Sequence, residues 1–590
     1  MLKRVTKATS LLVVAASIVS IVPAVAADYQ KVDAQEGYIN AASAEGNGIF
    51  VIDGEVNGSD DDEIYYLAGG KYTALDYVES GDTIDDTYSS KYKRIIGNKG
   101  DNIIDLTDGK ESDDFNFDVY KDDIARNLKK KIKKDNDGRF DSADYDNTTV
   151  AADTTFRFDG KQFMYGAFGN WSQFDYNLKT PNINGTTTST IYTDPDGNYV
   201  DADYNLGRIQ VFTTTSESAY VENTKDTYDI TENGKKYELK AQIENVKAYT
   251  EGYDALYRTA KLTIWKKEKD ASDDEYENIT DSVKFGSTSD QREVPTNEDG
   301  SITVLQKISK AQSSDTVDGI KYAKDVATYF ITDKDGKTES VLGIDHPYNP
   351  SGISTNVDGI VSYYYDSDNK ELNAEAINLK SYKDYNYVDL SDSDEVDVDA
   401  WANGGGQIYG VGDGYVYKWD GKDKFEKIYK VDSSMSNISV SDENNIIVWN
   451  KDKDIYSAIS NKASTSTGND TATTAGVTTT TGAAVTTTTV RTGWVKGDDG
   501  NWSYNDTDGS KKKGWLMDSG SWYYLKANGT MATGWINDGD YWYYLKANGA
   551  MSTGWINDNG SWYYCSESGE MLADTTVDGY VLGSSGAWIN

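Results

Sequence analysis

Tryptophans near the end of the chain recur at a fixed spacing. Trp515, Trp535 and Trp555 each follow a glycine, at intervals of 20 residues. A second set opens the neighbouring aromatic runs, namely Trp502, Trp522, Trp542 and Trp562. Electron-rich ring faces attract cations, and they also stack on the apolar face of a sugar. The spacing therefore predicts a series of aromatic clefts that suit a quaternary ammonium or a carbohydrate.

Two short strands joined by a turn account for each repeat. From residue 534 the unit reads GWINDGDYWYYLKANGAMSTGW, with Gly-containing polar segments between aromatic runs, which predicts a β-hairpin. Strand alternation places Trp522 and Tyr524 on one face and Tyr523 and Leu525 on the other. One hairpin cannot bury its aromatic face alone. We therefore expect a solenoid of stacked hairpins in which one face packs and the other binds.

These repeats resemble the choline-binding, or cell-wall-binding, repeats of Gram-positive surface proteins and of phage or bacterial lysins. The resemblance covers about 100 of the 590 residues. In that family a site lies between neighbouring hairpins and combines two Trp of one unit with a Tyr, and often a Met, of the next. Carried onto this chain, the resemblance implies one site at Trp515, Trp522, Met531 and Tyr544, and a second at Trp535, Trp542, Met551 and Tyr564.

Both ends of the repeat array depart from the pattern. Trp494 and Trp502 are a poorer match for an earlier site, because WSY replaces WYY and the two Trp are eight residues apart rather than seven. At the other end the resemblance extends the ligand-binding set to Trp555, Trp562 and Tyr580. The closing sequence VDGYVLGSSGAWIN differs from the repeat, and a terminal cap containing Tyr580 and Trp588 is the alternative.

The expected partners follow from the same clefts. The resemblance implies choline on cell-wall teichoic acid, and a wall carbohydrate remains the alternative ligand. Cys565 occupies the repeat position of Leu525 and Leu545, which predicts a small buried side chain. As the only cysteine, it cannot form an internal disulfide.

Composition divides the chain into four segments. Residues 1–26 have a basic start, an apolar run and small residues at the end, which predicts a secretory signal peptide. Residues 27–462 form an acidic, Tyr-rich module. Residues 463–491 are rich in Thr, and Asp470 is the only charged residue between Ser464 and Thr489, which predicts a flexible linker. Residues 492–590 hold the repeats. We expect a protein exported to the bacterial cell wall or surface.

The large module reads as short strands around polar turns, as in EIYYLAGGKYTAL from Glu63 and QIYGVGDGYVYKWDG from Gln407. Four or five strands in about 50 residues favour a β-propeller, with packed β-sandwiches as the alternative, so the predicted fold class is all-β. One helix is predicted at 120–134, where Ile124, Leu128 and Ile132 follow each other at intervals of four residues.

A formal net charge of −39 argues against nucleic acid and anionic membranes as electrostatic partners. No other segment has the length of a membrane span, so we expect no membrane contact after signal cleavage. The displayed module is expected to bind a host, matrix or wall ligand that the sequence does not identify.

Enzyme signals are sparse. His346 is the only histidine, which argues against a Cys-His hydrolase and a conventional catalytic zinc site. We expect no cofactor and no metal. The stretch KKDNDGRFDSAD resembles a calcium loop, but Lys133 stands at its first ligand position. The sequence favours a binding protein, and a wall hydrolase or glycosidase with a carboxylate pair in the large module is the alternative.

Overall fold

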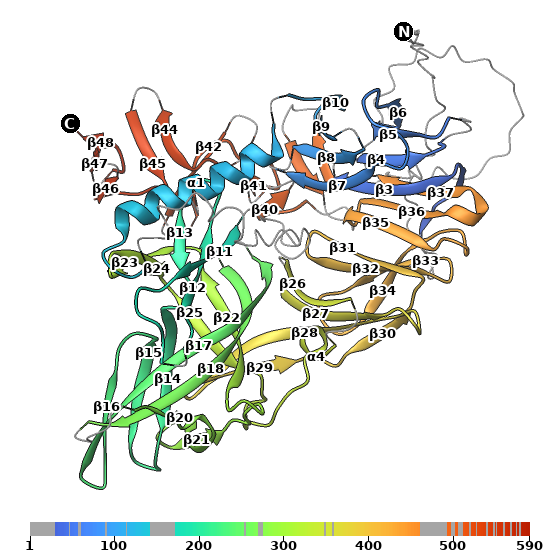
Figure 1. Cartoon of the computed structure of the whole chain (residues 1–590). Helices are drawn as coiled ribbons and strands as arrows, with labels where there is room; N and C mark the ends of the chain where they lie inside the picture. Colours follow the sequence, from blue (N-terminus) through green and yellow to red (C-terminus); the bar gives the residue numbers. More distant parts are fainter. Residues whose placement is uncertain are drawn as a thin grey trace, which may run out of the picture. The chain divides into compact units, whose positions relative to one another are not determined.

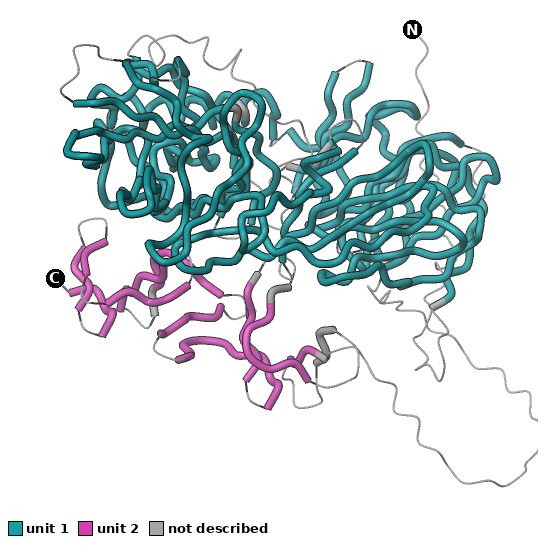
Figure 2. The backbone as a smooth tube through the Cα atoms, turned by 90° about the horizontal axis from the view of Figure 1, so that it is seen from below, with its two compact units in different colours: residues 1–466 teal, residues 467–590 magenta. Residues whose placement is uncertain are grey.

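Strands dominate the computed structural model, which describes residues 30–141, 171–460 and 493–589 with short gaps inside each range. The chain divides into two units, residues 1–466 and 467–590, and each is described by itself (Figure 2). The boundary lies inside segment 463–491. The predicted signal peptide and the whole of the predicted linker lie outside the described residues, whereas the all-β fold class is confirmed.

Unit 1 begins with two antiparallel sheets whose strands follow the chain order. The first contains β3 (Ile39–Gly46), β4 (Ile49–Gly54), β5 (Glu63–Ala68) and β6 (Lys71–Ala74). The second contains β7 (Thr83–Tyr88), β8 (Tyr92–Gly97), β9 (Gly100–Asp105) and β10 (Lys110–Glu111). Gly69 and Gly70 both have positive φ, and they form the tight turn between β5 and β6 that the sequence predicts.

The end of unit 1 repeats this arrangement. One sheet contains β31 (Ala400–Gly404), β32 (Gln407–Gly412), β33 (Tyr415–Trp419) and β34 (Phe425–Lys430). The next contains β35 (Asn437–Asp442), β36 (Asn445–Asn450) and β37 (Ile455–Ser460). Strands from the start of the unit complete both sheets, because β1 (Gln30–Lys31) pairs with β34 and β2 (Gln35–Glu36) pairs with β37. The two ends of unit 1 are thus joined (Figure 1).

Consecutive sheets pack through shared buried clusters. Phe50 on β4 lies in one cluster with Trp449 on β36, and the Tyr72 and Tyr456 hydroxyls are 2.7 Å apart across the same contact. Another cluster joins the sheet of β3–β6 to that of β7–β10. Four-stranded antiparallel sheets packed in this way resemble propeller blades.

The middle of unit 1 departs from that pattern. Its largest sheet runs in the order β16 (Tyr228–Glu232), β17 (Lys235–Glu251), β18 (Ala255–Glu268), β22 (Ile302–Ser309), β25 (Val326–Phe330), β29 (Tyr385–Leu390), β28 (Glu371–Tyr382), β27 (Gly359–Asp366) and β26 (Ser351–Asn356). β19 (Glu277–Asn278) and β30 (Asp394–Asp397) extend it to 11 strands. A continuous sheet of this size is no propeller blade, and a complete propeller stays a prediction.

Two smaller sheets are formed by strands that precede the large sheet in the chain or lie in sequence between its strands. One has the order β11 (Ser172–Asn177), β12 (Thr188–Thr193), β13 (Tyr199–Asp201), β24 (Ile320–Ala323) and β23 (Gln312–Val317). The other has the order β15 (Ser218–Asn223), β14 (Asn205–Phe212), β20 (Lys284–Ser287) and β21 (Asp290–Glu293).

The predicted helix is confirmed as α1 (Phe117–Asp135), which is longer at its N-terminus than expected (Figure 1). Asn116 caps it by accepting a 2.9 Å hydrogen bond from the Val119 N–H. The predicted stripe of Ile124, Leu128 and Ile132 is buried in one cluster with residues of β11, β12 and β13. The helix therefore packs on a sheet through one apolar face.

Unit 2 is a series of two-stranded hairpins. They are β38 (Gly493–Lys496) with β39 (Trp502–Asn505), β40 (Gly514–Asp518) with β41 (Ser521–Leu525), β42 (Gly534–Asp538) with β43 (Tyr541–Leu545), and β44 (Gly554–Asp558) with β45 (Ser561–Cys565). A three-stranded sheet of β46 (Thr575–Val577), β47 (Tyr580–Leu582) and β48 (Trp588–Ile589) follows. The predicted hairpin repeats are confirmed.

Glycine is required before the repeated Trp. Gly514, Gly534 and Gly554 have φ values of +77°, +72° and +75°, a left-handed conformation that side chains with a Cβ rarely adopt. Backbone hydrogen bonds also join successive repeats, because the Met551 N–H donates to the Trp522 carbonyl at 2.7 Å. The chain thereby returns to the preceding hairpin and stacks the repeats.

Candidate ligand clefts between the aromatic hairpins

Strand register decides which way each aromatic ring points. Trp515 on β40 lies opposite Tyr524 on β41, so both share a face with Trp522. Tyr523 and Leu525 lie on the other face, where Leu525 is buried. The predicted alternation of the two faces is confirmed for this hairpin.

The Trp515 ring meets aromatic rings from two hairpins. Its centroid lies 6.2 Å from that of Trp522 and 5.2 Å from that of Tyr524, both on its own hairpin. Tyr543, on the following hairpin, lies 4.8 Å away at an interplanar angle of 72°. The Trp515 ring is therefore packed edge-to-face against rings of its own hairpin and of the following one.

The same arrangement recurs along unit 2. Trp535 lies 5.0 Å from Tyr544 of its own hairpin and 4.9 Å from Tyr563 of the next. Trp555 lies 5.3 Å from Tyr564, and Tyr580 on β47 lies 5.3 Å from Trp555. Three successive clefts are therefore walled by rings from two neighbouring elements.

The observed Tyr partner differs by one residue from the one that the sequence predicts. Tyr544 was expected at the Trp515 cleft, but the strand register places it opposite Trp535 on its own hairpin. Tyr543 lies on the opposite face of β43 and contacts Trp515. By the same alternation Tyr563, rather than Tyr564, contacts Trp535. Ligand binding by either set stays a prediction.

Each of these methionines lies between two successive hairpins. Met531, which was expected beside Trp515 and Trp522, pairs with Leu525 of that hairpin, and its N–H donates to the Trp502 carbonyl of the preceding hairpin at 2.7 Å. Met551 likewise pairs with Leu545, and its N–H donates to the Trp522 carbonyl at 2.7 Å. A contact of either methionine with a ligand stays a prediction.

Several predicted ligand-binding rings are open to solvent. Trp542 is 46% exposed and Trp562 is 41% exposed, which is unusual for side chains of this size. In the last element Tyr580 and Trp588 are also exposed, and their ring centroids lie 5.2 Å apart at 90°. The terminal sheet thus extends the aromatic surface. The Trp494 side chain lies outside the described residues, whereas Trp502 is exposed.

A carboxylate that the sequence reasoning missed lies at the first of these clefts. The Trp515 Nε1–H donates to Asp538 Oδ2 at 2.9 Å, and the Tyr524 hydroxyl donates to Asp538 Oδ1 at 3.2 Å. Burial, followed by the Asp538 charge, raises the pKa of Tyr524. The sequence contained a pattern that could have identified this carboxylate, because Asp518, Asp538 and Asp558 recur with the same 20-residue spacing as the GW tryptophans.

The prediction for Cys565 is confirmed. Its side chain is fully buried, as are those of Leu525 and Leu545 at the equivalent positions. Burial raises the pKa of the thiol to about 11, which disfavours the reactive thiolate. The residue therefore acts as a small apolar side chain.

Family models match the repeats. One described as choline-binding repeat matches residues 532–575, and one described as putative cell wall binding repeat matches residues 513–531. The choline-binding domain of Spr1274 from Streptococcus pneumoniae is 40% identical, with 13% of this chain and 96% of that domain covered and a TM-score of 0.13. Through its C-terminal segment, the chain belongs to the choline-binding repeat family. Choline-binding repeats indicate a surface protein that is held non-covalently at the cell wall.

Two further solved structures share this likeness. The pneumococcal cell wall endolysin from phage Cp-1, solved with choline, is 46% identical, covering 14% of this chain and 24% of the endolysin with a TM-score of 0.13. Choline binding protein F from Streptococcus pneumoniae is 19% identical, covering 65% of this chain and 99% of that protein with a TM-score of 0.16. No curated protein matches the chain.

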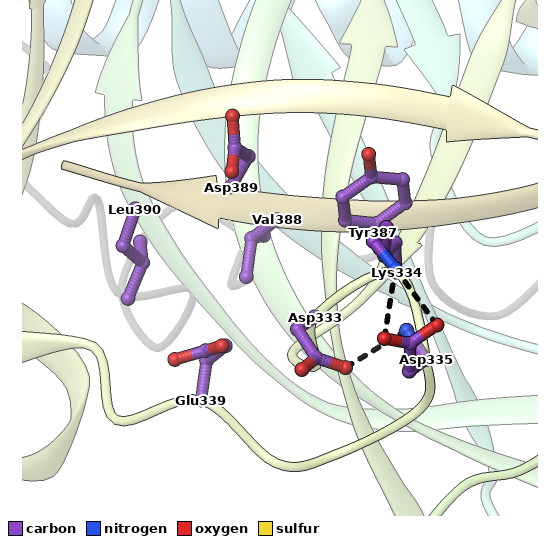
Figure 3. Close-up of a pocket in the computed structure, with 8 residues that line it drawn as sticks. All are labelled: Asp333, Lys334, Asp335, Glu339, Tyr387, Val388, Asp389 and Leu390. Carbon is purple, nitrogen blue, oxygen red and sulfur yellow. Dashed lines mark hydrogen bonds and ion pairs between the residues drawn. The ribbon is translucent and has the colours of Figure 1, made fainter.

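Unit 1 of this choline-binding repeat protein contains an acidic cavity of about 210 Å³ (Figure 3). Its carboxylates come from Asp333, Asp335, Glu339 and Asp389. Asp333 accepts hydrogen bonds from the Asp335 and Lys337 N–H groups at 2.9 and 3.0 Å, so its side chain caps the backbone of the turn. Lys334 pairs with Asp335 at 2.8 Å. These contacts describe a solvated turn.

Other carboxylates of unit 1 are engaged in local contacts. The neighbouring Glu395 carboxyl, followed by burial, raises the pKa of Glu371. Glu375 is buried and accepts a 2.8 Å hydrogen bond from the Leu342 N–H, at the start of α4 (Leu342–Asp345). Burial raises the pKa of Glu375 to about 7.

Among the residues that the structure describes, no three His, Cys, Asp or Glu side chains are grouped so that they could hold a metal ion. In the calcium-like stretch, Asp135 instead accepts a 2.9 Å hydrogen bond from the Tyr199 hydroxyl, and Asp144 lies outside the described residues. Over the same residues, no helix has the length and apolar character needed to cross a membrane.

Proposed function

We propose that this protein is exported and held on a Gram-positive cell wall by its hairpin repeats, which bind the choline of teichoic acid. The observation that carries the proposal is the contact of Trp515 with Tyr543 of the next hairpin, repeated by Trp535 with Tyr563. A quaternary ammonium between such rings gains about 2 kcal/mol when it is desolvated.

Repetition compensates for weak individual sites. Because teichoic acid carries many choline groups, each bound cleft raises the effective ligand concentration at the next one. Three clefts walled by Trp515, Trp535 and Trp555 then hold the protein more firmly than one cleft would. We infer that the repeats supply localisation, and that unit 1 is displayed through segment 463–491 to a host, matrix or wall ligand.

Titration of the full chain with free choline tests the ligand. We expect saturable quenching or a shift of tryptophan fluorescence at millimolar choline, and loss of most of that signal in a variant in which Trp515, Trp535 and Trp555 are all replaced by Ala. Tyr77→Ala is the matched control, because Tyr77 is 62% exposed in unit 1. A signal from wall glycan fragments instead of choline would assign a carbohydrate ligand. No response to either would refute the proposal.

A further inference from the structure

Two acidic side chains lie at the cleft between hairpins β40–β41 and β42–β43. Asp538 lies opposite Tyr541, so it shares with Tyr543 the face of its hairpin that meets Trp515. Its two oxygens accept hydrogen bonds from Trp515 and Tyr524 of the preceding hairpin. The carboxylate therefore spans the gap between the hairpins beside the aromatic rings.

Glu570 approaches the same cleft from a later loop. It pairs with Tyr543 in an isolated antiparallel bridge. Burial, followed by the Glu570 and Asp538 charges, raises the pKa of Tyr543, which places both carboxylates within electrostatic reach of that ring. The cleft thus combines aromatic faces with two negative charges.

The residue that pairs at this position differs in two other repeats. In the following repeat Ala587 pairs with Tyr563, and in the first hairpin Thr530 pairs with Ser503, where Glu570 pairs with Tyr543. Those two residues carry no charge. The Trp515 cleft is therefore set apart from its neighbours by an acidic side chain that the repeat pattern does not demand.

Charge distinguishes a quaternary ammonium from a neutral ligand of the same shape that the same aromatic rings accept. A quaternary ammonium has no N–H to donate, so it is recognised by ring faces and by negative charge. A neutral molecule of the same shape gains the apolar contact but not the Coulomb attraction, which is strong only over a few ångströms and weakens with salt.

We propose that Asp538 and Glu570 make the Trp515 cleft selective for quaternary ammonium ligands over neutral ligands of the same shape, and more so than the clefts of Trp535 and Trp555. This inference rests on the proposed function, which it refines. Asp538 additionally acts as a positioning residue, because it holds the Trp515 indole through its N–H.

The test uses the full chain labelled with 5-fluorotryptophan, with the Trp515 ¹⁹F resonance assigned by its loss in Trp515→Phe. Choline and its neutral isostere 3,3-dimethylbutan-1-ol are titrated at low salt. We expect Asp538→Asn and Glu570→Gln each to weaken choline binding at Trp515 about tenfold, while binding of the isostere stays unchanged. Glu426→Gln, an exposed carboxylate change in unit 1, is the control.

The outcomes separate this inference from the proposed function. If choline shifts the Trp515 resonance equally in the parent chain and both variants, the selectivity is refuted and the choline site stands. Equal weakening of choline and isostere would also refute it, because that result indicates a structural role alone. Glu570→Gln guards against misfolding of the Asp538 variant. If choline does not move the parent resonance at all, the proposed function itself fails.

Discussion

The indole N–H of Trp515 donates a 2.9 Å hydrogen bond to Asp538, which lies on the following hairpin. Because Tyr543 packs on the same indole at 4.8 Å, the ring is held by two residues of a neighbouring repeat. Each cleft is therefore built by two hairpins together, and a repeat in isolation lacks half of its wall.

The register of the Tyr residues gives the first prediction. Tyr543→Ala should weaken choline binding at the Trp515 cleft by about 2 kcal/mol, since it removes one aromatic wall. Tyr544→Ala should leave that cleft intact and disturb Trp535 instead, which Tyr544 contacts. The choline-dependent resonances of fluorinated Trp515 and Trp535 measure both effects. If Tyr544→Ala weakened choline binding at Trp515 and Tyr543→Ala did not, Tyr544 would be the true partner of Trp515.

Cys565 should be chemically silent in the folded protein. Its thiol pKa of about 11 leaves very little thiolate at pH 8, so a disulfide reagent should label the native chain far more slowly than the unfolded chain. Cys565→Ser should destabilise unit 2 by about 1–3 kcal/mol, because a hydroxyl is buried in an apolar position. Denaturant unfolding followed by tryptophan fluorescence measures that loss. Rapid native labelling would contradict the burial.

Glu375 predicts a pH dependence of stability in unit 1. Burial raises its folded pKa to about 7, above an unfolded value near 4.3. Between these two pKa values the folded state keeps a proton that the unfolded state releases. The contribution of Glu375 to the free energy of unfolding is therefore largest below pH 4, falls as the pH rises from 4 to 7, and levels off above pH 7. The total fall is about 4 kcal/mol, at about 1.4 kcal/mol per pKa unit.

The Glu375→Gln variant separates the pH dependence that Glu375 causes from that of the many other carboxylates. The amide does not ionise, so the difference in unfolding free energy between parent and variant should change across pH 4–7 and stay constant above it. Parallel curves for the two proteins would contradict the assignment of the raised pKa to Glu375.

The buried face of helix α1 gives a prediction for the stability of unit 1. Leu128 is fully buried against the sheet, so Leu128→Ala should destabilise unit 1 by about 2–5 kcal/mol. Val119→Ala, at an exposed position of the same helix, should change stability by less than about 0.5 kcal/mol. Calorimetry measures both losses, and equal losses in the two variants would contradict the burial of Leu128.

Sequence patterns predicted those features of the fold that residues close in sequence determine. The 20-residue period gave the hairpins, and the spacing of Ile124, Leu128 and Ile132 predicted the buried face of α1, because neighbours in sequence settle both features. The Gly before each Trp fits the same logic, since its positive φ is a property of one residue.

Contacts between residues that are distant in the chain could not be predicted from the sequence. Alternation shows that Tyr543 and Tyr544 occupy opposite faces, but only stacking decides which face meets Trp515. The same limit applies to Asp538, whose partners belong to another hairpin, and to β1, which pairs with β34 about 400 residues later. Register between distant strands depends on packing that composition does not specify.

Retention of the full chain on purified choline-containing walls, with and without millimolar free choline, tests the central claim most directly. The clefts of Trp515, Trp535 and Trp555 predict firm binding that free choline releases, and loss of binding when these three residues are replaced by Ala. Binding that ignores choline and survives those replacements would contradict the claim.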